Sequence, residues 1–186
     1  MNILFLDIDP RMCAYAHCDE HVKGMIPIYT KLLSTAHHLL DPKGKIVPYL
    51  EEVDPNYKII GALDSVPITA AWVKANDANY MWMHDLWFWM HKEYWYRYDE
   101  MHEDWTNLYN KLSHTPENII KGELTSPPLS VSEEFMVHEL EDEFQNTIES
   151  YRSYYKNWVT ENDAKWGGIV ENMRTPPSWI IENANV

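Results

Sequence analysis

The sequence predicts a mainly α-helical protein: a short N-terminal strand followed by an orthogonal helical bundle with one long central helix. Two observations carry this prediction. Apolar residues recur at spacings of three and four along the long segments, which is the period of a helix with one buried face. One apolar, β-prone segment lies near the N-terminus, and few other segments of the chain have the pattern of a strand. A length of 186 residues suits one domain, so we expect a single helical domain over 1–186.

The first part of the domain, residues 1–64, is predicted to hold the strand, a helix pair and a loop. "NILFL" is the strand, and "DIDP" ends it. Asp9 is then placed to cap a helix that begins at Pro10, because proline is favoured at a first helical position. Pro27 is expected to end or restart this helix, and a second helix runs on to Leu40. Three prolines and two glycines after it predict an irregular connection.

Residues 65–113 form the predicted long central helical region. Ser65 and Pro67 open a short helix, and the longest element follows from about Asp77 to about Leu112. This continuous helix is expected to be the centre of the bundle.

The last part of the chain is predicted to be a loop over 114–129, a C-terminal helix over 130–162 and an irregular tail over 163–186. Ser130 and Glu133 have the spacing of a capping box at the start of that helix. Its apolar stripe has helical spacing and consists of Met136, Leu140, Phe144, Ile148, Tyr151, Tyr155 and Trp158.

Composition argues against several classes of function. The chain has 29 acidic and 15 basic residues and a net charge of −14, whereas phosphate binding favours a basic field. The same balance disfavours an anionic membrane surface, and no run reaches the ~18 apolar residues of a membrane span. The two cysteines suit reduced thiols, and the start of the chain lacks the basic region of a signal peptide. We therefore expect a soluble cytoplasmic protein without a membrane partner.

The central helix carries the most informative pattern. At 100° per residue, His84, His91 and His102 fall on one line of a continuous helix. Tyrosine and tryptophan rings flank that line, in a chain with nine Trp, twelve Tyr and only four Phe. The face could be the wall of a groove that stacks flat ligands such as bases or sugars. The same pattern is also typical of core packing by amphipathic rings.

A second cluster lies in the first helix. Cys13, His17 and His21 recur every four residues, and an i, i+4 histidine pair is a known zinc geometry. The segment lacks the H-E-x-x-H pattern and a clear fourth ligand, so we predict no metal and no cofactor. These three residues stay the candidates for the alternative, a metal site. Asp19 and His21 are more simply read as polar groups at the edge of a cleft.

Several motifs together resemble a family of small proteins of tailed bacteriophages, including phages of cyanobacteria: "CDEHVKGM", "LLSTAHHLL", "NDANYMWMHDLW", "KEYWYRY" and "RTPPSW". The resemblance runs in the same order over most of the chain, and it implies expression in the host cytoplasm. The stretch around His21 is also similar to phage pyrimidine-dimer DNA glycosylases, which are small helical enzymes that flip a base out of the duplex. In that similarity His21 matches an early-helix histidine, and Ile28 stands where those enzymes carry a glutamate.

The leading hypothesis is therefore a phage enzyme that processes nucleic acid or nucleotides, with glycosylase-like DNA repair or base processing. Its cleft would lie between residues 17–21 and the aromatic face of the central helix. The predicted catalytic groups are His21 as proton donor and Glu93 or Asp19 as acid/base carboxylate. The predicted substrate-binding residues are a basic residue and a set of rings, namely Arg97, Tyr94, Tyr98, His84, Trp87 and His91.

Two alternatives stay open. The first is a non-catalytic acidic protein that binds a host or phage protein through its aromatic surface. The second is a metal-dependent hydrolase at Cys13, His17 and His21. DNA or a nucleotide is the expected partner under the leading hypothesis, and a protein under the first alternative.

Overall fold

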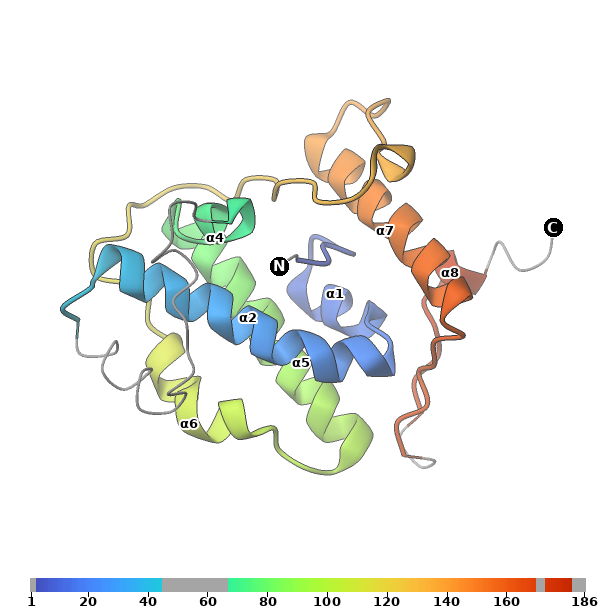
Figure 1. Cartoon of the computed structure of the whole chain (residues 1–186), viewed down its shortest axis with the longest axis horizontal. Helices are drawn as coiled ribbons and strands as arrows, with labels where there is room; N and C mark the ends of the chain where they lie inside the picture. Colours follow the sequence, from blue (N-terminus) through green and yellow to red (C-terminus); the bar gives the residue numbers. More distant parts are fainter. Residues whose placement is uncertain (1–2, 45–66, 170–172, 182–186) are drawn as a thin grey trace.

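The computed structural model describes residues 3–44, 67–169 and 173–181, and the fold is mainly helical, as predicted (Figure 1). In chain order the elements are α1 (Pro10–Ala16), α2 (Asp19–Leu40), α4 (Ile68–Val73), α5 (Asp77–Tyr98), α6 (Glu103–Leu112), the 3-10 turn η1 (Glu133–Phe135), α7 (Glu143–Glu161) and α8 (Ser178–Ile181). From residue 45 onward, the loop predicted between α2 and α4 lies outside the described residues, as does Ser65.

The predicted N-terminal strand is wrong. Residues 3–6 are buried as expected of an apolar run, but the described residues contain no strand that could pair with them. Side chains bond their backbone instead: the Cys13 thiol accepts from Leu6 N (3.4 Å) and donates to Leu4 O (3.2 Å), and Arg152 Nε donates to Leu6 O (2.9 Å). Buried peptide groups need partners, and here side chains of α1, α2 and α7 supply them.

The first helix pair divides before Pro27. α1 ends at Ala16, and His17 and Cys18 have extended backbone with ψ of 133° and 172° before α2 begins at Asp19. Pro27 lies inside α2, where the missing N–H removes one helical hydrogen bond. Packing of α2 against α5 and α4 keeps the helix continuous in spite of that loss. Residues before and after position 17 therefore do not share one helix face.

The predicted continuous central helix is broken at Asp99. α5 ends there because Asp99 is left-handed (φ 52°, ψ 31°), while its N–H still bonds to Trp95 O (2.8 Å). His102 then caps α6, with Nδ1 accepting from Asp104 N at 3.2 Å. His102 is therefore no longer in line with His84 on one helix.

The C-terminal helix begins at Glu143, and not at the capping pattern around Ser130. The Asp142 side chain accepts from Phe144 N (2.8 Å) and provides the N-cap. Within the stretch before it, Leu140 is 43% exposed and Met136 is only half-buried, so this part of the predicted apolar stripe is not sealed in the core. A local capping pattern does not suffice where tertiary packing is missing.

Helix α5 is the centre of the core. α1, α2 and α4 all contact it, and α2 lies across it in Figure 1. The Trp87 ring on α5 is fully buried, and its Nε1 donates to Thr30 Oγ1 of α2 (2.8 Å). α6 closes this side, with the Trp105 and Trp87 ring centroids 6.1 Å apart. In the ranges that the structure describes, no helix is both long and apolar enough to cross a membrane.

Replacing Tyr29 with Phe tests the bonding of the N-terminal segment. The Tyr29 hydroxyl accepts from Leu4 N (3.4 Å) and contacts His17 Nε2 (3.1 Å), all in the core. Its loss leaves two buried polar groups unpaired, so the free energy of unfolding should fall by about 1–3 kcal/mol in urea denaturation. Tyr109→Phe, at a half-buried ring, is the control and should change it by less than about 0.5 kcal/mol. Equal effects of the two variants would contradict the assignment.

Candidate functional site

Four charged residues form one buried ion network, here named the Glu93 network: Asp19, Glu93, Arg97 and Arg174. Arg97 donates from Nε and Nη2 to Glu93 Oε2 (3.1 and 3.0 Å) and from Nη1 to Asp19 Oδ1 (3.0 Å). Arg174 donates from Nε to Glu93 Oε2 (3.0 Å) and from Nη2 to Oε1 (2.7 Å). One carboxylate thus lies between two guanidinium groups.

The Glu93 network joins the C-terminal segment to the helical core. Asp19 Oδ2 accepts from the backbone N–H groups of Gly167 and Gly168 (2.7 and 3.0 Å). Gly168 has φ +52°, and a Cβ at this position would lie 2.9 Å from the Arg97 Cβ and backbone oxygen. Only glycine fits this close approach without strain. The network is thus a clamp that holds the segment after α7 against α2 and α5.

The structure brings three predicted site residues together, but it closes them to a substrate. Glu93 is 1% and Arg97 0% exposed, and both oxygens of Glu93 accept from guanidinium groups. Opposite charges balance within the cluster, which is what burial of charge requires. A carboxylate held in this way is a structural anchor. Asp19 retains some exposure, 18% of its side chain.

His21 lies in a neighbouring aromatic cluster. Its Nδ1 is 3.0 Å from the Tyr155 hydroxyl, which also accepts from Cys18 N (2.8 Å). The Trp158 ring lies 4.1 Å from the His21 ring. Burial lowers the pKa of His21 to about 4, although the charge of Glu20 acts in the opposite direction. The imidazole is therefore neutral at pH 7, and the role of His21 as proton donor stays a prediction.

The metal alternative at Cys13, His17 and His21 finds no support in the geometry. Burial raises the pKa of the Cys13 thiol to about 12, and that thiol bonds to the N-terminal backbone. His17 Nδ1 bonds to Cys13 O (2.7 Å), and its Nε2 faces Tyr29. Among the described residues, no group of three His, Cys, Asp or Glu side chains is placed to hold a metal ion. The break between α1 and α2 separates the expected ligands.

The remaining predicted binding residues divide between the core and the surface. Trp87 is fully buried and His84 is 7% exposed, so neither offers a face to a ligand. Tyr94 and Tyr98 are half-buried, with ring centroids 5.0 Å apart, and the Lys23 ammonium lies 4.2 Å from the Tyr98 ring. The predicted groove wall is therefore mostly core packing, the alternative that the sequence left open.

Sequence reasoning missed a cleft of about 530 Å³, here named the α1–α8 cleft. Its lining combines charged, hydroxyl and aromatic side chains: Asp7, Met12, Tyr15, Ala16, Arg152, Arg174, Thr175, Pro177, Ser178 and Trp179. α8 lies beside the C-terminal half of α7 in Figure 1, and the Trp179 and Tyr155 ring centroids are 6.2 Å apart. The motif "RTPPSW" was the available signal, because it concentrates an arginine and a tryptophan in a tail without helical periodicity.

Two arginines line the cleft, and each is paired with carboxylates. Arg152 pairs with Asp7 (3.2 Å) and Glu149 (3.0 Å), and its guanidinium lies 5.1 Å from the Trp179 ring centroid. Arg174 lies 4.7 Å from the Tyr15 ring centroid. Burial disfavours the charge of Arg174, but its bonds to the Glu93 network outweigh that effect and raise its pKa. The second arginine therefore belongs to both the cleft and the network.

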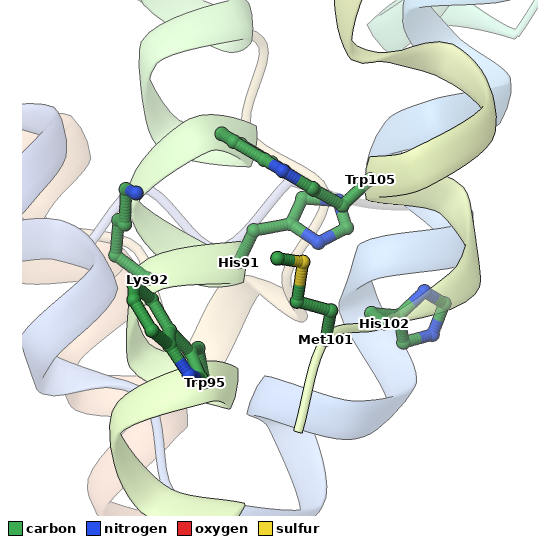
Figure 2. A pocket seen from close by; sticks show the side chains of 6 residues that line it. All are labelled: His91, Lys92, Trp95, Met101, His102 and Trp105. Atoms are coloured by element: carbon green, nitrogen blue, oxygen red, sulfur yellow. The ribbon is translucent and has the colours of Figure 1, made fainter. Parts of the chain in front are cut away.

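A second hollow, here named the His91 pocket, lies between α5 and the start of α6. It is a cavity of about 40 Å³ lined by His91, Lys92, Trp95, Met101, His102 and Trp105 (Figure 2). His91, which the sequence predicted as a binding residue, is 4% exposed and has no hydrogen-bond partner for either ring nitrogen among the described residues. Burial, together with His102 and Lys92, lowers the pKa of His91 to about 3.

No protein-family model matches this chain, and comparisons with curated proteins and with solved structures also find no match. The resemblances to phage proteins and to pyrimidine-dimer glycosylases therefore stay predictions. Function has to be inferred from the cleft and the pocket themselves.

Replacing Glu93 with Gln should destabilise the protein strongly. The change leaves Arg97 and Arg174 in a buried site without the carboxylate that both contact. Breaking a buried ion pair from one side costs about 3–5 kcal/mol, which urea denaturation would measure. Glu149→Gln removes a partly exposed carboxylate from Arg152 and should cost less than about 1 kcal/mol. A small effect at both positions would show that the network is not an anchor.

Stability should fall with acidification below pH 6.5. Burial lowers the pKa of His17 and His91 to about 3 and of His21 and His37 to about 4, while the unfolded value is 6.5. Between these pKa values the unfolded chain binds more protons than the folded one. The contribution of these histidines to the free energy of unfolding is therefore complete above pH 6.5 and is lost as the pH falls towards the folded pKa. The slope should reach about 1.4 kcal/mol per pH unit for each such histidine.

Urea denaturation at pH 7, 6 and 5 would measure this slope. His37 Nε2 bonds to the Tyr80 hydroxyl (2.8 Å), and a glutamine amide can keep that bond. His37→Gln should therefore reduce the slope, and a free energy of unfolding that does not change over this range would refute the prediction.

Proposed function

We propose that this protein binds a nucleotide in the α1–α8 cleft. The observation that carries the proposal is the lining of the cleft, in which two guanidinium groups and two aromatic rings border about 530 Å³. That volume lies within the range of about 300–1,000 Å³ in which proteins bind small molecules. A nucleotide joins an anionic group to a flat ring, and the cleft offers a complement to each.

The anionic part of the ligand is assigned to the arginines. Arg174 uses Nε and Nη2 on Glu93, and its Nη1 has no acceptor among the described residues. Arg152 uses its nitrogens on Leu6 O, Glu149 and Asp7, so its charge is already paired and Arg174 is the principal anion-binding group. One phosphate at Arg174 would complete the hydrogen bonds of that guanidinium.

The nucleoside part of the ligand is assigned to the aromatic rings and the polar acceptors of the same cleft. Trp179 and Tyr15 provide ring faces for stacking, which is worth about 1–3 kcal/mol per base. Asp7 is an acceptor for amino or hydroxyl groups, and Thr175 and Ser178 add hydroxyls. A sugar and a base carry donors for these acceptors, whereas the Asp7 carboxylate would repel a simple anion.

A free nucleotide suits the protein better than duplex DNA does. Affinity for duplex DNA grows with the number of phosphates that the protein neutralises, and this chain carries a net charge of −14. The glycosylase-like hypothesis also needs a free acid/base carboxylate, and Glu93 lies sealed between Arg97 and Arg174. The proposal therefore keeps the nucleotide part of the sequence-based hypothesis without that catalytic set.

A specific observation favours the non-catalytic interaction protein as a second candidate. Trp95 and Tyr96 are 49% and 41% exposed, and Asp99 and Glu100 are exposed beside them. Exposed rings bordered by carboxylates are a suitable surface for a protein partner. The Tyr96 ring lies 3.8 Å from the Arg174 guanidinium, so this surface borders the α1–α8 cleft, although Trp95 and Tyr96 are not among its lining residues.

Calorimetric titration with nucleoside monophosphates tests the proposal. We expect saturable binding, with weaker binding of the nucleoside alone, of inorganic phosphate and of a duplex oligonucleotide. Trp179→Ala should weaken binding about tenfold or more through lost stacking. Trp95→Ala removes an exposed tryptophan outside the cleft and should leave the affinity unchanged. No saturable heat at low salt, or equal losses in the two variants, would refute nucleotide binding at this cleft.

A further inference from the structure

His91 is a buried polar side chain that faces a cavity without a partner. It is 4% exposed, and neither ring nitrogen has a hydrogen-bond partner among the described residues. Other buried histidines are bonded, as His17 is to Cys13 O and His37 to the Tyr80 hydroxyl. An unpaired buried polar group is unfavourable, so a ligand that fills the cavity and hydrogen-bonds to His91 removes that cost when it binds.

The cavity has the size of a small functional group. Its volume is about 40 Å³, and one water-sized group needs about 10–15 Å³ of such space, so two or three non-hydrogen atoms fit. Figure 2 shows the Trp105 ring over His91 and the Met101 side chain in front of it. Trp95 and Met101 are 49% and 58% exposed, so the mouth of the cavity opens to solvent between apolar side chains.

The lining of the cavity contains one basic side chain, Lys92, beside its histidines. The Lys92 ammonium lies 5.0 Å from the Trp105 ring centroid and 5.3 Å from that of Trp95. His102 Nδ1 accepts from Asp104 N, so a neutral His102 carries its proton on Nε2 and is a donor. None of the six lining residues has a carboxylate. The Asp104 carboxylate lies outside this lining, 3.9 Å from His102 Nδ1, so within the lining Lys92 and the histidine donors favour an anion.

We propose that the His91 pocket binds the carboxylate of a small organic acid. A carboxylate oxygen accepts from a His91 N–H, and the Lys92 ammonium balances the charge. A short apolar tail lies against Trp95 and Met101 at the mouth, where the exposed apolar surface is. The site is separate from the α1–α8 cleft and does not depend on nucleotide binding.

A neutral amide is the informative competitor. Its carbonyl and amide N–H could together satisfy both nitrogens of His91, so hydrogen bonding alone would favour it at least equally. Only the charge of Lys92 makes the pocket prefer a carboxylate of the same shape. Propionate and propionamide form such a matched pair.

The experiment is a titration of the full chain with sodium propionate and with propionamide at constant ionic strength. Two-dimensional NMR of the histidine ring and tryptophan indole signals reports on His91, Trp95 and Trp105. We expect saturable shifts at these residues with propionate, at least tenfold tighter than with propionamide. Lys92→Met keeps the length of the side chain and should abolish this preference, whereas Lys121→Met on an exposed loop should keep it.

Each other result overturns the proposal. Propionamide that binds as tightly as propionate, or a preference that survives in Lys92→Met, would show that charge recognition is absent. Propionate without saturable shifts at His91 would show that the cavity holds only solvent. A failed nucleotide titration would leave the outcome unchanged, because different residues line the two sites.

Discussion

The burial of the Arg97 guanidinium is the constraint on which the rest of the structure depends. A fully buried positive charge is tolerated only with close anionic partners, and Glu93 and Asp19 supply them. Their two negative charges then call for a second cation, which Arg174 brings from the C-terminal segment. The hydrogen bonds from Gly167 and Gly168 to Asp19, and the close approach of Gly168 to Arg97, belong to the same network. Because Arg174 also lines the α1–α8 cleft, the cleft wall is positioned by this ion network.

The N-terminal segment meets a similar requirement through hydrogen bonds. Its buried peptide groups bond to side chains of α1, α2 and α7, where a sheet would have used a neighbouring strand. Arg152 has a part in both regions, because it bonds to Leu6 O and also lines the cleft beside Trp179. The proposed ligand site therefore rests on residues that the fold already holds, and the charges that line it are held in place before any ligand arrives.

The central helix shows how one residue pattern serves two purposes. Trp87 is sealed under α2 and α6 and stabilises the core, whereas His91, one turn further along, reaches a cavity at the surface. The left-handed residue Asp99 turns the chain so that His102 comes back towards His91, with ring centroids 5.5 Å apart. A continuous helix would have held these two rings more than two turns apart. The pocket thus exists because the helix breaks.

The sequence by itself determined the helical class, the Asp9 cap of α1 and the burial of residues 3–6. These features depend on local periodicity, on capping chemistry and on apolar runs, which short stretches of chain express. Only the tertiary structure decided what bonds to the N-terminal backbone, where α5 ends, where α7 begins and how the cleft forms. Arg97 and Asp19 are 78 positions apart and Arg174 and Glu93 are 81, and a local pattern carries no information about such pairs. Because these distant residues pair and pack together, most of the aromatic face of α5 is buried in the core. The sites open to solvent are the α1–α8 cleft and the His91 pocket.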